Sequence, residues 1–542
     1  MPRDAQVIIA GAGPVGLAAA LELGLRGVEV LILDKQDRAG WHPRAKTTHV
    51  RTVEFFRRWG IAGRLRELAP LPPDHPPDIR FKTRLFGYDL ACFKNAFFTS
   101  PKRDERYNEH AQWIPQYKVE QVLREKLSTL KNVSLRQGVE VLDVSQTGEG
   151  VQSPGVQVRA RDLANALALE FQAEYLIGAD GPGSTVRRSL GIAMQGEREL
   201  GNFINIIFRC PQLGRMQPER KGFVYWIVNP ASPGALGQMD VDDIWALITV
   251  LRPGEEKLDE PQIRRRIDAA VGRPVECELV ATDYWTASRS SAESYGRGRI
   301  FLAGDSCHVH PPFGGYGMNM GIADAVDLGW KLAAVLQGWG GAALLAAYED
   351  ERRPVHEAVM NEAVQNLAVQ SQHLLHDQLE MDSPEGAAVR RDMGAAILKQ
   401  KAAEFHTLGI VLGVNYSGSP LVIPDGSSPP ALSTLYTPSA HPGCLAPHLW
   451  LADGSSLYDH FGAGFTLLVM TSAPDDEDIL QLQEAFADLH LPLRTIAPGN
   501  HRLAALYQAP LAIIRPDQHV AWRGEHFDGN ARSIAASVAG HA

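Results

Sequence analysis

The sequence contains few cysteines, only five in 542 residues, at positions 92, 210, 277, 307 and 444. They are odd in number and widely spaced, and no two of them form a Cys-x-x-Cys pair. The chain therefore offers neither a disulfide framework nor the ligand spacing of a zinc site. This pattern is typical of a reducing compartment, so we expect a cytoplasmic protein without a metal centre.

Long hydrophobic runs and an excess of basic residues are also missing. The uncharged apolar run over 5–21 is short for a membrane span and contains a Gly-Pro turn, so we expect no membrane segment. The formal net charge of −10 argues against a nucleic-acid partner. There are no repeats, and 542 residues with 45% hydrophobic content indicate a globular protein of two to four domains.

The N-terminal segment has the pattern of a dinucleotide-binding unit. An apolar strand over 7–10 runs into Gly-Ala-Gly-Pro-Val-Gly at 11–16, and an apolar helix over 17–25 follows. A second apolar strand over 28–33 ends on an acidic residue. A glycine-rich turn framed by strand, helix, strand and acid is the context that a phosphate-binding fingerprint requires.

Each part of this segment has an expected role. Gly11 makes the tight turn, Gly13 lets the backbone approach a pyrophosphate, and Gly16 lets the helix pack against the strand. The helix N-terminus faces the anion, and Asp34 can accept hydrogen bonds from ribose hydroxyls. The motif predicts dinucleotide binding but does not choose between NAD and FAD.

Two further motifs lie later in the chain. The strand over 175–179 ends in Asp180-Gly-Pro-Gly-Ser-Thr-Val-Arg187. The strand over 299–303 ends in Gly304-Asp305 and is followed by Pro312-Phe-Gly-Gly-Tyr-Gly-Met-Asn319, which opens a helix over 321–336. A strand, an acid and a glycine-rich loop at a helix N-terminus form a second site for polar or anionic ligand groups.

Together, the three motifs in this order resemble the FAD-dependent aromatic hydroxylases, which are single-component flavoprotein monooxygenases with a para-hydroxybenzoate-hydroxylase-like fold. In that family the first motif holds the ADP half of FAD, the second serves FAD and the pyridine nucleotide, and the third holds ribityl and isoalloxazine. His42-Pro-Arg44-Ala and Gln116-x-x-x-Glu120 resemble two further flavin-contacting segments. The resemblance implies the cofactor-binding residues Gly11, Gly13, Pro14, Gly16, Asp34, Lys35, Arg44, Gln116, Asp180, Gly304, Asp305, Pro312, Gly315, Gly317, Met318 and Asn319.

The resemblance covers nearly the whole chain, including a C-terminal stretch that looks like the thioredoxin-like tail of the phenol-hydroxylase branch. It implies an α/β fold with a discontinuous Rossmann-like FAD-binding domain over 1–77, 113–195 and 285–345. An antiparallel β-sheet substrate domain over 78–112 and 196–284 is inserted into it. A helical segment (346–416), a Pro/Ser-rich linker (417–442) and a thioredoxin-like α/β domain without Cys-x-x-Cys (443–542) complete the expected organisation.

The residues that would act on the substrate are harder to identify. Several phenol-oxidising relatives carry an aspartate in the loop that reads Ala45-Lys-Thr-Thr-His49 here, so that role does not transfer. Tyr225 and His49 are candidate phenol activators, and Pro312 is a candidate catalytic residue in the glycine-rich loop. The inserted sheet carries aromatic residues at 223, 225, 226 and 245, for each of which packing in the core is the more frequent role.

The resemblance implies an enzyme in which NADPH or NADH reduces the flavin and O2 adds at flavin C4a. The resulting hydroperoxide would hydroxylate a phenolic or polycyclic aromatic substrate. Three alternatives stay open: Baeyer–Villiger oxygenation of a polyketide-like ketone, a flavin dehydrogenase or reductase that uses O2 only as an electron sink, and a flavin-binding scaffold. The tail also suggests a homodimer by analogy.

Overall fold

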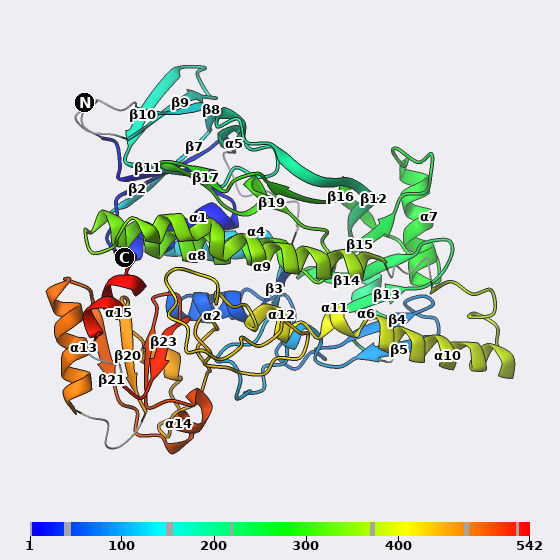
Figure 1. Cartoon of the computed structure of the whole chain (residues 1–542). Coiled ribbons are helices and arrows are strands. Elements are labelled where there is room, and N and C mark those ends of the chain that lie inside the picture. The colour runs from blue at the N-terminus through cyan, green and yellow to red at the C-terminus, as the bar shows by residue number, and fades with distance from the viewer. Residues whose placement is uncertain are drawn as a thin grey trace.

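A computed structural model describes residues 3–36, 45–147, 155–216, 220–368, 374–470, 476–526 and 530–541. Two long helices, α8 (Tyr316–Leu336) and α9 (Ala343–Ala368), cross the middle of the molecule (Figure 1). The C-terminal unit lies below one end of them, and the helix α10 (Pro384–Gln400) lies at the opposite end of the molecule. Among the described residues, no helix has both the length and the apolar character needed to cross a bilayer.

The first layer is a mainly parallel sheet with the strand order β17-β18-β11-β1-β2-β7. Its central strands, β1 (Val7–Ala10) and β11 (Tyr175–Gly178), are buried throughout, because helices and further sheets cover a parallel sheet on both faces. The remaining strands are β2 (Val30–Asp34), β7 (Val133–Gln137), β17 (Gly296–Arg297) and β18 (Ile300–Leu302). The helix α1 (Pro14–Leu25) follows β1 and packs against α8.

The segment between 133 and 177, which lies in the predicted FAD-binding domain, contributes strands to two different sheets. Gly138 has a φ of +70° and ends β7, and β8 (Val139–Gln146) then starts in a new direction. The strands β8, β9 (Val156–Asp162) and β10 (Ala168–Ala173) form a separate antiparallel sheet. Of the described strands in this region, only β7 and β11 join the parallel sheet.

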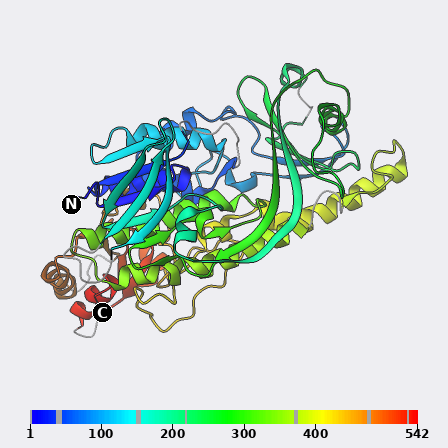
Figure 2. The same ribbon diagram turned by 90° about the horizontal axis from the view of Figure 1, so that it is seen from above.

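The second large sheet has the strand order β19-β16-β12-β15-β14-β13-β4-β5. All of its neighbours pair antiparallel except β4 with β13. The strands β12 (Met194–Arg209) and β16 (Glu278–Ala292) pair along most of their length and curve side by side away from the nucleotide-binding layer (Figure 2). The other strands are β4 (Ile79–Lys82), β5 (Asp89–Phe93), β13 (Val224–Ile227), β14 (Gly234–Asp240), β15 (Ile244–Val250) and β19 (His308–Val309).

One face of this second sheet packs against the helix α7 (Glu260–Val271), and the other face looks toward the glycine-rich motifs. Because β16 continues to residue 292 and β19 also joins the sheet, the sheet reaches past residue 284. The boundaries given above for the domains stay a prediction.

The C-terminal unit confirms the expected thioredoxin-like α/β arrangement. Its sheet has the order β21-β20-β22-β23, with β20 parallel to β21 and antiparallel to β22. These strands are β20 (Phe465–Val469), β21 (Leu493–Ile496), β22 (Leu511–Ile514) and β23 (Val520–Gly524). The helices α13 (Asp476–Asp488), α14 (His501–Tyr507) and α15 (Ala531–Val538) complete it.

A fully buried ion cluster joins this unit to α8 and α9. The Arg515 guanidinium donates to both carboxylate oxygens of Glu351, at 2.6 and 2.8 Å, and to Asp517 at 2.7 Å. The Lys331 ammonium bonds Glu351 at 2.6 Å and Asp327 at 2.8 Å. Burial raises the pKa of Asp327 above its usual range, and the nearby Lys331 ammonium opposes this effect.

Candidate functional site

The three glycines of the first motif occupy three different environments. Gly11 has a φ of +102°, and a Cβ there would lie 2.4 Å from the carbonyl oxygen of Ala179. A Cβ on Gly16 would lie 2.0 Å from the carbonyl oxygen of Gly11. A Cβ on Gly13, by contrast, would have no atom within 4 Å. The turn thus forbids side chains where it packs and leaves open space at Gly13, which fits a backbone that approaches a pyrophosphate.

The acidic residue after β2 lies against this turn. The Asp34 carboxylate accepts hydrogen bonds from the backbone amides of Ala12 at 2.5 Å and Gln36 at 2.7 Å. Lys35 follows it and is exposed. Arg44 lies outside the described residues. Gln116 begins the helix α4 (Gln116–Leu127), and its side-chain amide donates to Glu120 at 2.9 Å.

The second motif is a helix-capping turn that also contacts the third motif. The Asp180 carboxylate accepts from the backbone amides of Thr185 at 2.7 Å and Val186 at 3.1 Å, at the start of α5 (Thr185–Ser189). It also accepts from the Ser306 hydroxyl at 3.2 Å. Asp180 therefore holds two of the glycine-rich turns together.

Asn319 fixes the 312–319 loop at the N-terminus of α8. Its side-chain oxygen accepts from the backbone amide of His49 at 2.8 Å and from the Thr52 hydroxyl at 2.7 Å. Its side-chain nitrogen donates to the carbonyls of Thr47 at 3.0 Å and Gly315 at 2.7 Å. All of the hydrogen-bonding capacity of this amide is used within the protein, so Asn319 positions the loop and leaves the ligand contacts to its neighbours.

His49 supports the same loop from behind. Its ring is 2% exposed, and its Nε2 lies 2.9 Å from the carbonyl oxygen of Gly314. Burial lowers the pKa of His49 to about 4, so the ring is neutral at pH 7. A carbonyl only accepts, which fixes the proton on Nε2. His49 therefore acts as a buried donor to the loop, and it does not line the large cavity described below.

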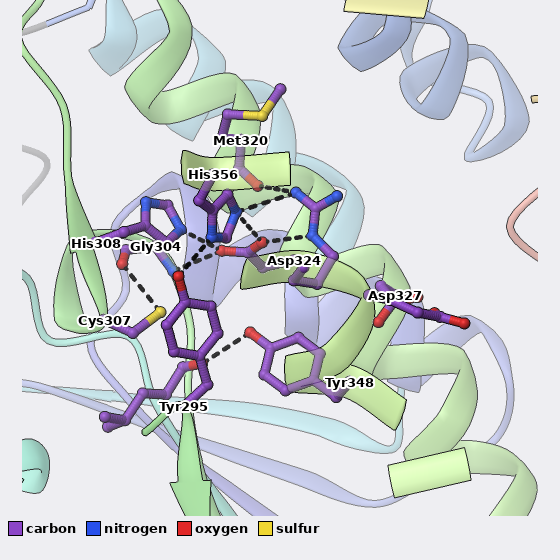
Figure 3. A network of polar contacts seen from close by, with 12 residues as sticks. Tyr295, Gly304, Cys307, His308, Met320, Asp324, Asp327, Tyr348 and His356 are labelled. Atoms are coloured by element: carbon purple, nitrogen blue, oxygen red, sulfur yellow. Dashed lines mark hydrogen bonds and ion pairs between the residues drawn. The ribbon is translucent and has the colours of Figure 1, made fainter. Parts of the chain in front are cut away.

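A second polar network is centred on Asp324 of α8 and joins the segment from Gly304 to His308 to α9 (Figure 3). The Asp324 carboxylate accepts from the backbone amide of Gly304 at 3.0 Å and from His308 at 2.6 Å. It also pairs with Arg352 and His356 of α9, each at 2.8 Å. Burial raises the pKa of the Asp324 carboxyl, but His356, His308 and Arg352 together hold this pKa well below its usual range. Among the described residues, two clusters approach metal-binding geometry, and their carboxylates are already paired with arginine or lysine: Cys307, His308 and Asp324, and Asp327, Glu351 and Asp517.

A cavity of about 650 Å³ opens between the nucleotide-binding layer and the second sheet. On one side it is lined by residues of all three motifs, and we call this side the glycine end: Gly13, Pro14, Gly181, Asp305, Pro312, Gly315, Gly317 and Met318. Gln116 also lines it. Eight of the sixteen cofactor-binding residues that the sequence predicts thus line one cavity. Open space at Gly13 and a helix N-terminus at Tyr316 fit an FAD molecule at this end.

Aromatic side chains line the opposite side of the cavity, which we call the aromatic end: Phe97, Phe203, Trp226, Trp285 and Phe405. Phe203 stacks on Trp285 with ring centroids 4.5 Å apart, and Trp226 stacks on Phe81 at 5.6 Å. Phe313 of the 312–319 loop lies between the two ends, 6.0 Å from Phe203 and 6.3 Å from Trp226. Flat apolar walls of this kind suit a planar aromatic ligand.

The structure places the side chain of Tyr225 away from the cavity. Side chains alternate along β13, so Val224 and Trp226 face the cavity while Tyr225 and Ile227 pack in the core beneath α7. The Tyr225 hydroxyl accepts from the backbone amide of Gly222 at 3.1 Å, and its ring does not line the cavity. Tyr225 is therefore not placed to touch a substrate there. Trp245 packs in the same core, and Phe223 packs against Trp113.

Sequence reasoning missed most of the aromatic end. Phe97, Phe203, Trp285 and Phe405 come from four distant segments and share no motif. It also missed a buried pair from the short helix α11 (Ala402–Phe405), where Lys401 and Glu404 form an ion pair and Glu404 lines the cavity. The Lys401 ammonium lies 5.0 Å from the Trp226 ring centroid. No local signal could have joined these segments before the fold was known.

Comparison with known proteins agrees with this geometry. Residues 4–363 match the family model of the FAD binding domain, and residues 439–542 match that of the aromatic-ring hydroxylase C-terminal domain. The chain is 31% identical over 554 residues to the FAD-dependent monooxygenase apdD of Emericella nidulans, covering 96% of this chain and 87% of the relative.

Two solved structures resemble the whole chain. The rebeccamycin biosynthetic enzyme RebC with reduced flavin superimposes with a TM-score of 0.90 at 33% identity and covers 100% of both chains. The ternary complex of aklavinone-11 hydroxylase with FAD and aklavinone gives a TM-score of 0.85 at 27% identity and covers 99% of both chains.

Proposed function

The chain belongs to the FAD-dependent aromatic-ring hydroxylases, and on that premise we propose that it uses NADPH or NADH together with O2 to hydroxylate a phenolic or polycyclic aromatic compound. The observation that carries this proposal is a single cavity lined by the three glycine-rich motifs on one side and by stacked aromatic rings on the other. A cofactor and a planar substrate can therefore meet without an intervening wall.

When bound, FAD would accept a hydride from NAD(P)H and, once reduced, activate O2 so that one oxygen atom reaches the ring and the other leaves as water. Gly13 and the amides around it would face the pyrophosphate, and Asp34 would face the ribose. Asp305 and the residues from Pro312 to Met318 would hold the ribityl chain and the ring system. The start of α8 would stabilise negative charge on the reduced ring.

The protein's own contributions would be geometry and the exclusion of water. Asn319 and His49 fix the 312–319 loop, so Pro312, Gly315 and Gly317 can hold the cofactor without reorganising. The aromatic end would orient the substrate and keep water away from the reacting atoms. The proposed reaction requires no nucleophile from the described side chains.

The test is an assay of the purified holoenzyme in air. NADPH and NADH oxidation are followed against a panel of phenols, aromatic acids and polycyclic quinones, with peroxide and product mass measured in parallel. We expect a compound that stimulates oxidation and gains one oxygen atom. A lactone or ring-opened product would indicate Baeyer–Villiger chemistry instead, and stimulated oxidation with a product that contains no new oxygen would support a dehydrogenase. Bound FAD with no stimulation by any compound would contradict the proposal.

A further inference from the structure

Lys46 is a cationic residue on the wall of the cavity that the proposed cofactor contacts do not use. It lies directly before β3 (Thr47–Thr48), is 9% exposed and lines the cavity. Within the described ranges its side chain forms no hydrogen bond and no ion pair, since only its backbone carbonyl is engaged, by the amide of Ile114. No other lysine or arginine of the described residues lines this cavity.

The position of Lys46 in the cavity is well defined by its neighbour. The carbonyl of Thr47 accepts from Asn319 at 3.0 Å, and a Cβ built on Gly315 would lie 3.1 Å from the Thr47 side chain. Lys46 is therefore attached to the 312–319 loop through the adjacent residue. It lines the same cavity as the glycine end and the aromatic end.

An unpaired buried ammonium is unfavourable unless something compensates it. Burial lowers the pKa of Lys46 to about 8, and the group is still mostly protonated at neutral pH. None of the other ionisable side chains on the cavity wall is bonded to it; these are Asp283, Tyr284, Asp305, His310 and Glu404. Glu404 is instead paired with Lys401. Among the described residues Lys46 has no partner, and a ligand would therefore supply one.

We propose that Lys46 binds an oxyanion carried by the aromatic substrate, and so selects rings that bear an ionised hydroxyl group or a carboxylate. This inference rests on the proposed function, because it takes the cavity to be the substrate site. An ionised hydroxyl beside the glycine end also places the ring there in its electron-rich form, which is the form that accepts an electrophilic oxygen.

The test is ligand binding to the oxidised holoenzyme without any NAD(P)H, followed by the change in the flavin absorption spectrum. The first probe pair is lawsone, a hydroxynaphthoquinone that is an enolate at pH 7, and its neutral methyl ether. The second pair is naphthoate and its neutral methyl ester. The variants are Lys46→Met, which keeps the chain length without charge, and Lys46→Arg, which keeps the charge.

For the wild type we expect at least tenfold tighter binding of the anion in one of the two pairs, and the pair that shows it identifies the oxyanion. Lys46→Met should remove this discrimination, and Lys46→Arg should retain it. Wild-type affinity for the anion should fall as pH rises through about 8, where Lys46 loses its proton, while the affinity of Lys46→Arg should stay level. Both variants should keep their flavin, and Lys46→Met should melt at the same or a higher temperature than the wild type.

Unchanged discrimination in Lys46→Met with full flavin content would overturn the inference, and so would an absence of discrimination in the wild type. Loss of flavin from Lys46→Met would assign Lys46 to the cofactor instead. Because no turnover is measured, these outcomes are independent of whether oxygen is inserted. A failure of the oxygenation assay would leave the Lys46 result intact, and the reverse also holds.

Discussion

The two ends of the cavity are built from different materials: glycine, proline and fixed backbone at one end, and large aromatic side chains from distant segments at the other. At the glycine end, three side chains form hydrogen bonds with the backbone of neighbouring turns: Asp180, Asn319 and His49. At the aromatic end the contacts are between rings. In the proposed function, backbone geometry would hold the cofactor, and side chains that can be exchanged would hold the substrate. Substitutions at the two ends should therefore have separable effects.

The largest expected effect on ligand binding is at the glycine end, in Gly13→Ala. Because a Cβ there meets no protein atom, the apoprotein should fold normally, but the methyl group would stand where the pyrophosphate approaches. We expect the dissociation constant for FAD to rise roughly 100-fold, or about 2.8 kcal/mol, in a titration of apoprotein followed by flavin fluorescence. Gly63→Ala, on the exposed surface of α3 (Ala62–Glu67), is the matched control and should leave FAD affinity unchanged. Equal FAD affinity in both variants would contradict the assigned role of Gly13.

Asn319→Ala should destabilise the glycine end of the cavity without removing a contact to the ligand. Removal of the amide leaves the backbone groups of Thr47, His49 and Gly315 without this partner in a buried site. We expect a loss of about 3 kcal/mol in the free energy of unfolding, measured by urea denaturation. The control Asn202→Ala breaks an exposed hydrogen bond to Thr286 and should cost well under about 1 kcal/mol. If the two variants proved equally stable, Asn319 would not be fixing the loop.

The support from His49 should show in the pH dependence of stability. Its pKa is about 4 in the folded protein against 6.5 for an ordinary histidine, so the unfolded chain binds the proton more tightly. The contribution of His49 to stability is therefore lost as pH falls from 6.5 toward 4. Relative to His49→Gln, the wild type should lose about 2 kcal/mol between neutral pH and about pH 5. Parallel pH profiles for the two proteins, measured by urea denaturation, would show that His49 is not buried as a neutral group.

At the aromatic end we expect a smaller effect confined to the substrate. Trp226→Leu removes a ring that stacks on Phe81 and lines the cavity. The dissociation constant for lawsone should rise about tenfold, or about 1.4 kcal/mol, while FAD affinity stays unchanged. A parallel loss of FAD would show that the two ends are not separable.

The smallest effect is expected one residue away, in Tyr225→Phe. This side chain lies on the other face of β13, so the variant should lose only its hydrogen bond to Gly222, worth about 1 kcal/mol of stability. The affinity for lawsone should match that of the wild type, and so should kcat with the compound that stimulates oxidation in the oxygenation assay. A tenfold fall in kcat for Tyr225→Phe would contradict its placement outside the cavity.

The glycine end could be predicted from the sequence because its constraints are local. Steric contact with the backbone allows only glycine at Gly11 and Gly16, and an acid at the end of the next strand faces the same turn, so fixed spacing reveals the site. The supports His49 and Asn319 lay within the resembling segments, but the sequence could not show that their side chains bond the loop and not the ligand.

The aromatic end could not be predicted from the sequence, because any large aromatic side chain can form such a wall. The register of the strand decides which side chain faces the cavity. A shift of one residue along β13 exchanges Tyr225 for Trp226, and an alternating sequence alone does not say which face is covered by α7. Phe97 and Phe405 reach the cavity from outside any motif. The lack of a partner for Lys46 among the described residues could not be predicted either, because it depends on which side chains lie around Lys46 in the folded protein.

The central claim, that one cavity joins a flavin and an aromatic ring for oxygen transfer, is tested most directly by the source of the oxygen in the product. The holoenzyme would be supplied with NADPH, the best-stimulating aromatic compound and ¹⁸O2, and the product mass would be measured. The account predicts one ¹⁸O atom in each product molecule and none when the label is supplied as water. A product without ¹⁸O, with all consumed O2 recovered as hydrogen peroxide, would contradict it.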